Sequence, residues 1–124
     1  MPIKLKRVYE PAADGDGYRV LVERLWPRGV SKERAHVDLW MKDAGASREL
    51  RVWFGHDPAK WEDFRMRYFE EIRKRPEVIR ELDKILARKK TVTFLFAAHD
   101  VLHNNAEALK EFLTTHHKIQ PGTT

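Results

Sequence analysis

The segment GYRVLVERLWPRG, residues 17–29, starts as a buried strand and ends in a polar loop. The contiguous Val20, Leu21 and Val22 are typical of a strand that is buried on both faces, because a strand with one exposed face alternates apolar and polar residues. Charged residues and turn formers follow at once: Glu23, Arg24, Trp26, Pro27, Arg28 and Gly29. We therefore expect a central strand whose carboxyl end leads into a polar loop.

Two further strands and an ambiguous segment can be read from the apolar pattern. Residues 91–98, TVTFLFAA, are almost continuously apolar and rich in strand formers, which predicts a second central strand. Residues 3–9, IKLKRVY, alternate apolar and basic side chains, as in an edge strand with one exposed face. The segment at 37–45, VDLWMKDAG, is interpreted as a short strand.

Helices are predicted between these strands from capping residues and apolar spacing. Asp57 and Pro58 favour a helix start, and apolar residues then recur at helical spacing as far as Ile72. Further helices are expected at residues 32–35, 47–54, 76–88 and 104–116. Strands that alternate with helices predict an α/β fold, here a small, open, mostly parallel sheet with helices packed on its faces.

Length and composition indicate one soluble domain. A chain of 124 residues suits a single core, and we place the domain at residues 1–118 with a flexible tail at 119–124. The hydrophobic fraction of 42% excludes a disordered chain, and no apolar run is long enough to cross a membrane. The lack of cysteine and of an apolar leader favours the cytoplasm, and the net charge of +5 suits anionic partners.

The predicted functional site lies at the carboxyl ends of the two central strands, where open α/β sheets bind ligands. The first strand is followed by Glu23, Arg24, Trp26 and Arg28. The second is followed, immediately before a helix, by His99, Asp100, His103, Asn104 and Asn105. Arginine side chains and a helix start both bind anions, and a tryptophan can stack on a ring. This pattern predicts a small phosphorylated or nucleotide-like anion as the ligand.

The same residues also allow a catalytic hypothesis and a purely structural interpretation. Asp100 or Glu23 could act as a base toward water, which would give hydrolysis without a protein nucleophile, and His99 or His103 could be a general base oriented by Asp100. Alternatively, Glu23 and Arg24 form structural ion pairs, Trp26 belongs to the core and Asn104 caps a helix.

Three other functions are compatible with parts of the sequence. Basic clusters around Arg67 and Arg73 could contact nucleic acid, although solvated helix surfaces explain them better. His99 and His103 would suit a metal only if their segment were helical. His56 could be a haem ligand beside an aromatic set that core packing explains more simply: Trp40, Trp53, Phe54, Trp61 and Phe64. We expect no metal and no cofactor, and nucleic acid is the alternative partner.

Three segments carry a resemblance to a known family: KRVYEPAADGDGYRVLVERLWPRGVSKERA, ELRVWFGHDPAKWEDFRMRY and TVTFLFAAHDVLHNNAEAL. They cover nearly the whole chain and resemble the YeaO-like branch of the DUF488 family, a family of unknown function. The resemblance implies a compact α/β domain. Other branches of the family carry cysteines near the corresponding strand ends, where this chain has Ala97 and Ala98, so a mechanism that uses a thiol is excluded here.

The resemblance also draws attention to the residues that fit the family motifs. It adds Arg51 to the predicted ligand-binding set of Arg24, Trp26, Arg28 and Asn104. The full set of matching positions is Arg7, Tyr18, Arg19, Glu23, Arg24, Trp26, Pro27, Arg28, Trp40, Lys42, Leu50, Arg51, His56, Asp100 and Asn104.

Overall fold

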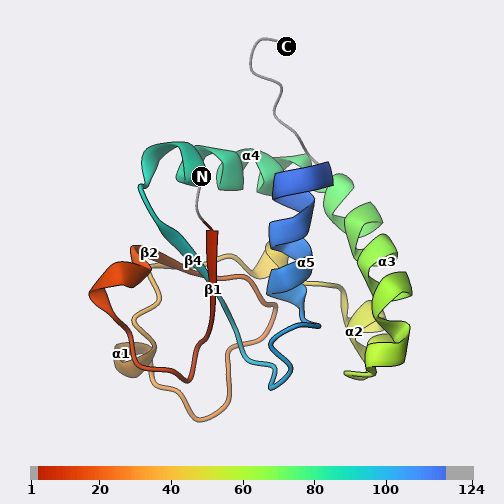
Figure 1. Ribbon diagram of the computed structural model, residues 1–124, viewed down its shortest axis with the longest axis horizontal. Helices are drawn as coiled ribbons and strands as arrows, with labels where there is room; N and C mark the ends of the chain where they lie inside the picture. Colours follow the sequence, from red (N-terminus) through yellow and green to blue (C-terminus); the bar gives the residue numbers. More distant parts are fainter. Residues whose placement is uncertain (1–2, 117–124) are drawn as a thin grey trace.

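The computed structural model describes residues 3–116 and shows a four-stranded sheet with helices on both faces (Figure 1). The strands are β1 (Ile3–Arg7), β2 (Tyr18–Leu21), β3 (Leu39–Trp40) and β4 (Val92–Phe96). The helices are α1 (Lys32–Ala35), α2 (Arg48–Phe54), α3 (Trp61–Arg73), α4 (Pro76–Arg88) and α5 (Asn105–Glu111), and a π-helical turn, Phe112–His116, continues α5. The expected tail at 119–124 lies outside the described residues.

The sheet has the strand order β1-β4-β2-β3, and all of its strand pairs are parallel. β4 pairs with β1 from Ile3 opposite Val92, and with β2 from Tyr18 opposite Val92. The predicted α/β class, the edge position of the first strand and the central positions of β2 and β4 are confirmed. Because β2 and β4 are parallel neighbours, the loops that follow them lie at the same edge of the sheet.

Both central strands bury side chains on two faces. In β2 and just after it, Val20 and Val22 belong to the larger core, whereas Leu21 between them belongs to a smaller core on the opposite face. In β4, Phe94 and Leu95 divide between the two cores in the same way. The continuous apolar runs in the sequence therefore arise because helices α2 to α5 cover one face, while α1 and its neighbouring loops cover the other.

Local sequence signals set several helix ends. Ser31 caps α1 and Ser47 caps α2, each by accepting a hydrogen bond from a backbone amide of the first turn. Asp57 caps a short 3-10 turn that leads directly into α3, and Pro76 is the first residue of α4. The expected strand at 37–45 is wrong in extent: it forms only at Leu39–Trp40, and a 3-10 turn follows at Lys42–Ala44.

No helix within residues 3–116 combines the length and apolar character that crossing a membrane requires.

Candidate functional site

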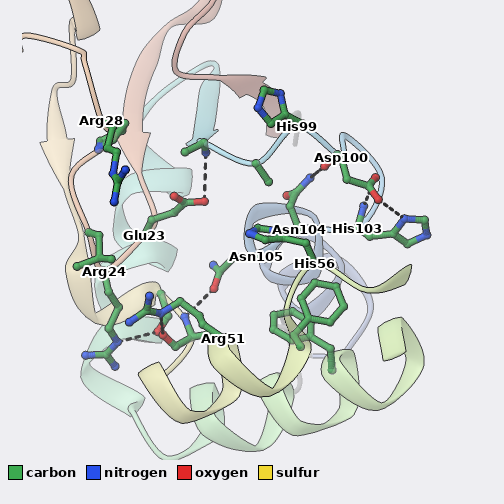
Figure 2. A pocket seen from close by; sticks show the side chains of 18 of the residues that line it. Glu23, Arg24, Arg28, Arg51, His56, His99, Asp100, His103, Asn104 and Asn105 are labelled. Atoms are coloured by element: carbon green, nitrogen blue, oxygen red, sulfur yellow. Dashed lines mark hydrogen bonds and ion pairs between the residues drawn. The ribbon is translucent and has the colours of Figure 1, made fainter. Parts of the chain in front are cut away.

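A pocket of about 840 Å³ lies beyond the carboxyl ends of β2 and β4 (Figure 2). The loop after β2, the loop after β4, helix α2 and the segment before it all line this pocket. Its volume is within the range of small-molecule sites. All seven residues predicted for the site line it: Glu23, Arg24, Trp26, Arg28, Arg51, Asp100 and Asn104.

The pocket has two chemically different sides with Glu23 between them. Figure 2 shows Arg24, Arg28 and Arg51 on one side, and His56, His99 and His103 on the other. Apolar residues complete the lining, among them Leu25, Val52, Phe54 and Phe64. One side of the pocket therefore suits an anionic group, and the remainder suits a ring.

Glu23 is the partly buried carboxylate of this pocket. Its Oε2 accepts a hydrogen bond of 3.2 Å from the backbone amide of Ala97, the first residue after β4. Burial raises the pKa of Glu23 above its ordinary value, while the Ala97 amide and the positive charge of Arg51 oppose that rise. The backbone carbonyl of Glu23 accepts a 2.7 Å hydrogen bond from Trp40 Nε1, which fixes the end of β2.

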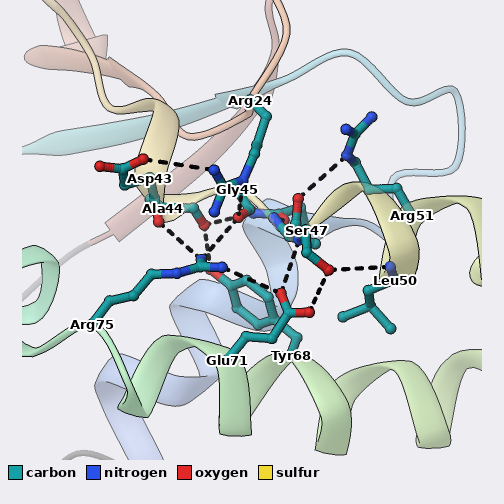
Figure 3. Close-up of polar contacts among 12 residues, drawn as sticks. Arg24, Asp43, Ala44, Gly45, Ser47, Leu50, Arg51, Tyr68, Glu71 and Arg75 are labelled. Carbon is teal, nitrogen blue, oxygen red and sulfur yellow. Dashed lines mark hydrogen bonds and ion pairs between the residues drawn. The ribbon is translucent and has the colours of Figure 1, made fainter.

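Arg24 and Arg51 are held by backbone carbonyls of the segment before α2 (Figure 3). Arg24 Nε donates to the carbonyl of Gly45 at 3.1 Å, and Arg51 Nε donates to the carbonyl of Ala46 at 3.3 Å. Arg24 Nη1 also lies 3.6 Å from a carboxylate oxygen of Asp43. A Cβ at position 45 would come within 2.6 Å of the Arg24 backbone nitrogen, so this approach requires glycine.

Residues 43–47, which we call the clamped loop, are held by helix α3 and by Arg75, which lies between α3 and α4 (Figure 3). The Tyr68 hydroxyl donates to the Ala44 carbonyl at 2.6 Å, and Arg75 Nη1 donates to the carbonyls of Asp43 and Gly45 at 3.0 and 3.1 Å. Glu71 accepts hydrogen bonds from both the amide and the hydroxyl of Ser47. These contacts fix the carbonyls on which Arg24 and Arg51 depend.

Asn105 joins the clamped loop to the end of β2. Its Oδ1 accepts a 2.6 Å hydrogen bond from the Ala46 amide, and its Nδ2 donates to the Val22 carbonyl at 3.0 Å. Tyr68, Glu71 and Arg75 were not among the residues predicted for the site, because they contact residues 43–47, which are distant in sequence. A buried polar residue at a strand end or on an apolar helix face is the only sequence signal for such a role.

Arg28 and Trp26 differ in how firmly they are held. Arg28 is exposed, and its carbonyl accepts a 3.0 Å hydrogen bond from the Tyr9 hydroxyl, while its guanidinium forms no hydrogen bond or ion pair with the other residues that the structure describes. Trp26 Nε1 donates to the Val30 carbonyl at 2.7 Å, and its ring packs edge-on against Trp40. Trp26 is thus a fixed wall of the pocket, and Arg28 is a loop arginine held at its backbone.

Asp100 and Asn104 organise the loop after β4. Asp100 Oδ1 accepts hydrogen bonds from the amides of Leu102 and His103, and its Oδ2 lies 2.8 Å from Nδ1 of His103. The contact with His103, followed by the Leu102 amide, lowers the pKa of Asp100. Asn104 is the N-cap of α5, accepts from the Glu107 amide and donates to the Asp100 carbonyl. These contacts fit structural roles, and the predicted base role of Asp100 stays a hypothesis.

Other residues that the family resemblance singled out support the fold around the pocket. Arg7 donates through Nε and Nη2 to the carbonyls of Ala98 and Ala97, which secures the loop after β4.

Gly29 has a φ of 74°, so the expected sharp turn is present, although nothing lies within 4 Å of where a Cβ would be.

The alternative sites find less support. Within residues 3–116, no three histidine and acidic side chains gather where they could hold a metal. The proposed haem-lining set is divided, since Phe54 and Phe64 line the pocket with His56, whereas Trp40 packs behind the lining residue Trp26 and does not line the pocket itself. On the helical basic clusters, Arg65 pairs with Glu62 and Glu111, and Arg67 and Arg73 stack on aromatic rings.

A family model described as "Inactive DUF488-N3 subclade" matches residues 2–123. The chain belongs to the DUF488 family. It is 39% identical over 113 residues to the uncharacterized protein YeaO of Escherichia coli (strain K12). The aligned residues cover 91% of this chain and 97% of YeaO. It is 38% identical over 111 residues to an uncharacterized protein of Mycobacterium tuberculosis (strain ATCC 25618 / H37Rv), covering 90% of this chain and 92% of the relative. No solved structure matches the chain significantly.

These comparisons confirm the predicted DUF488 membership. The description of the matching model calls the DUF488-N3 subclade inactive and names no ligand. A role for the pocket must therefore be argued from its own geometry.

Proposed function

We propose that this DUF488 protein binds a small phosphorylated or nucleotide-like anion in the pocket beyond β2 and β4. The observation that supports this most directly is the pair of arginines that face the same pocket. Arg28 has a guanidinium without a partner among residues 3–116, and Arg51 uses only Nε on the Ala46 carbonyl, which leaves its Nη groups for a ligand. Arginine Nη groups bind phosphate or carboxylate oxygens through charge-assisted hydrogen bonds.

The rest of the pocket supports a ligand that carries a ring beside its anionic group. Trp26, Phe54 and His56 line the pocket, and the hydrogen bond of Trp26 to Val30 fixes its ring in place. An aromatic wall that is already ordered binds a ring at little entropic cost. The proposal therefore places the anionic group at the arginines and the ring toward the aromatic and histidine side.

Binding, rather than turnover, is the function we propose. The Asp100 carboxylate is engaged by two amides and by His103, and its lowered pKa makes it a weak base. Glu23 retains a raised pKa and is the group that would serve a hydrolytic reaction. Release of inorganic phosphate from a bound ligand, lost in Glu23→Gln, would show that the site also catalyses hydrolysis.

The test is thermal unfolding of the full chain against inorganic phosphate, sulfate, nucleotides, sugar phosphates and short oligonucleotides. A ligand that binds the native state raises the unfolding temperature in a saturable way. Arg28→Ala is expected to weaken binding by at least about tenfold, because it removes a charge-assisted contact without touching the core. Arg80→Ala is the matched control, since Arg80 is an exposed arginine on α4 that does not line the pocket.

Two results would contradict the proposal. Equal affinity in wild type and Arg28→Ala would show that the arginine side does not hold the anion. A shift produced by oligonucleotides alone, lost at moderate salt, would instead favour nucleic-acid binding through phosphate contacts.

A further inference from the structure

One oxygen of the Glu23 carboxylate is available to a ligand. Oε2 accepts the amide of Ala97, and Oε1 takes part in no hydrogen bond or ion pair with any residue from 3 to 116. In that same part of the chain, no buried side-chain nitrogen or oxygen lacks a hydrogen-bond partner. Oε1 is therefore not buried, and since Glu23 lines the pocket, this oxygen is accessible from the pocket.

The neighbouring polar side chains are already engaged. Asn105 uses its carbonyl oxygen on Ala46 and its amide nitrogen on Val22. Asn104 caps α5 through its oxygen, and Asp100 has contacts at both oxygens. Glu23 thus offers a ligand an acceptor close to the arginines, and Figure 2 shows its carboxylate between the two sides of the pocket.

We infer that Glu23 determines specificity in this pocket: its free oxygen accepts a hydrogen bond from the ligand and selects phosphorylated compounds that carry an N–H or O–H donor, as nucleotides do. This inference rests on the proposed anion binding, and it narrows the ligand from anions in general to anions that also present a donor.

The selection follows from the charge of Glu23. A simple anion held at Arg28 and Arg51 gains their attraction but meets the nearby negative charge of Glu23, which opposes its binding. A ligand with a donor directed at Oε1 converts that repulsion into a charge-assisted hydrogen bond. Specificity of this kind combines an attractive contact for the correct ligand with a repulsive one for the wrong ligand.

Glu23→Gln tests the inference because it changes one oxygen and keeps the other contact. The Gln oxygen can still accept from the Ala97 amide, which places the side-chain NH₂ toward the pocket. The variant therefore replaces a charged acceptor with a neutral donor. Simple phosphates should bind as well or better, while phosphates with a directed donor should bind less well, and a misfolded variant would instead lose affinity for both.

The experiment measures dissociation constants by calorimetry for phenyl phosphate, ribose 5-phosphate and the four common nucleoside monophosphates. Phenyl phosphate carries a ring without an N–H or alcohol donor. In wild type, the best donor-bearing phosphate should bind at least about tenfold more tightly than phenyl phosphate. In Glu23→Gln this preference should fall to within about threefold, with phenyl phosphate bound no more weakly than in wild type.

Glu81→Gln is the matched control, because Glu81 is an exposed glutamate on α4 that does not line the pocket. It removes the same charge and should leave the preference unchanged. If Glu23→Gln fails to fold, the wild-type protein decides the question by its preference for 4-aminophenyl phosphate, which adds N–H donors to the same ring, over phenyl phosphate.

The outcomes separate the two proposals. Binding that depends on Arg28 but shows no preference for a donor, or a preference that survives Glu23→Gln, overturns the role of Glu23 and leaves anion binding intact. A wild-type protein that binds none of the probes overturns both.

Discussion

The charged residues at the two ends of β2 are arranged in opposite ways. At the entrance, Arg19 is buried and every nitrogen of its guanidinium has a partner: Asp16 through Nη1, the Ala35 carbonyl through Nη2 and the His36 carbonyl through Nε. Asp16 in turn accepts from Lys6 and from the Ala13 amide. This is a closed network that leaves no group for a ligand.

At the exit of β2, the charged groups are only partly satisfied. Glu23 has one engaged oxygen, Arg51 is held only at Nε, and Arg28 is held at its backbone. The pKa values of the two carboxylates reflect this contrast. Burial raises the pKa of Glu23 above its ordinary value. At Asp16 burial has the same raising effect, but the contacts with Ala13, Lys6 and Arg19 outweigh it and lower the pKa. Closed networks stabilise a fold, and open ones are available for binding.

The largest loss of folding stability is expected for a substitution in the closed network around Arg19. Arg19→Ala removes one partner of a buried ion pair and leaves two carbonyls without their donor. Loss of one partner in such a pair costs about 3 kcal/mol, at the lower end of the usual range because Lys6 still contacts Asp16. Urea unfolding measures this loss, and a change below about 1 kcal/mol would show that the network is not closed as described.

A smaller loss is expected at the clamped loop, which links the exit of β2 to helix α3. Tyr68→Phe removes the hydroxyl that donates to Ala44 and leaves that carbonyl with a long 3.4 Å contact from Asn105. The expected cost is about 1–2 kcal/mol in the free energy of unfolding. Tyr9→Phe is the control, because its exposed hydroxyl bonds only the Arg28 carbonyl, and equal losses in both variants would refute the clamp.

The place of the pocket could be predicted from the sequence because it depends on strand order alone. The apolar runs around Leu21 and Leu95 indicated two central strands, and parallel neighbours bring their exit loops together. All seven predicted residues consequently line one pocket. Which of their atoms remain free could not be predicted, since that depends on carbonyls such as Gly45 and Ala46, which the fold brings close from elsewhere in the chain.

The same limit explains the missed and misjudged elements. The segment at 37–45 looked like a strand because Leu39 and Trp40 are apolar, but only these two residues pair with β2. The chain then turns away so that Gly45 can contact Arg24, a requirement that comes from packing and not from local propensity. The hydrogen bonds that Asp100 accepts from the Leu102 and His103 amides could not be predicted for a similar reason, because they depend on the loop conformation, and its predicted base role stays a hypothesis.

The carboxylates at the two ends of β2, Asp16 and Glu23, should also change the folding stability with pH in opposite directions. The raised pKa of Glu23 means that its ionised form destabilises the folded state above the folded pKa, and this penalty disappears as the pH falls toward the ordinary value of 4.5. Glu23→Gln should therefore be more stable than wild type near neutral pH, with the gain fading in acid. Asp16 has a lowered pKa, so its contribution is present above 3.8 and is lost as the pH falls through its folded pKa.

Unfolding curves of wild type and Glu23→Gln at several pH values measure this difference. A variant that is less stable than wild type at neutral pH would show that the attraction of the Glu23 charge to the Ala97 amide and to Arg51 outweighs the cost of burying that charge.

The smallest change in folding stability is expected for Arg28, whose guanidinium forms no hydrogen bond or ion pair with residues 3–116. Arg28→Ala should change the free energy of unfolding by no more than about 0.5 kcal/mol, because the side chain is exposed and only its backbone carbonyl accepts a hydrogen bond, from Tyr9. Urea unfolding beside Arg80→Ala provides the comparison. A loss above about 1 kcal/mol would make Arg28 structural, like Arg19. Little change in stability together with lost anion binding would instead show that the exit of β2 retains an arginine for its ligand.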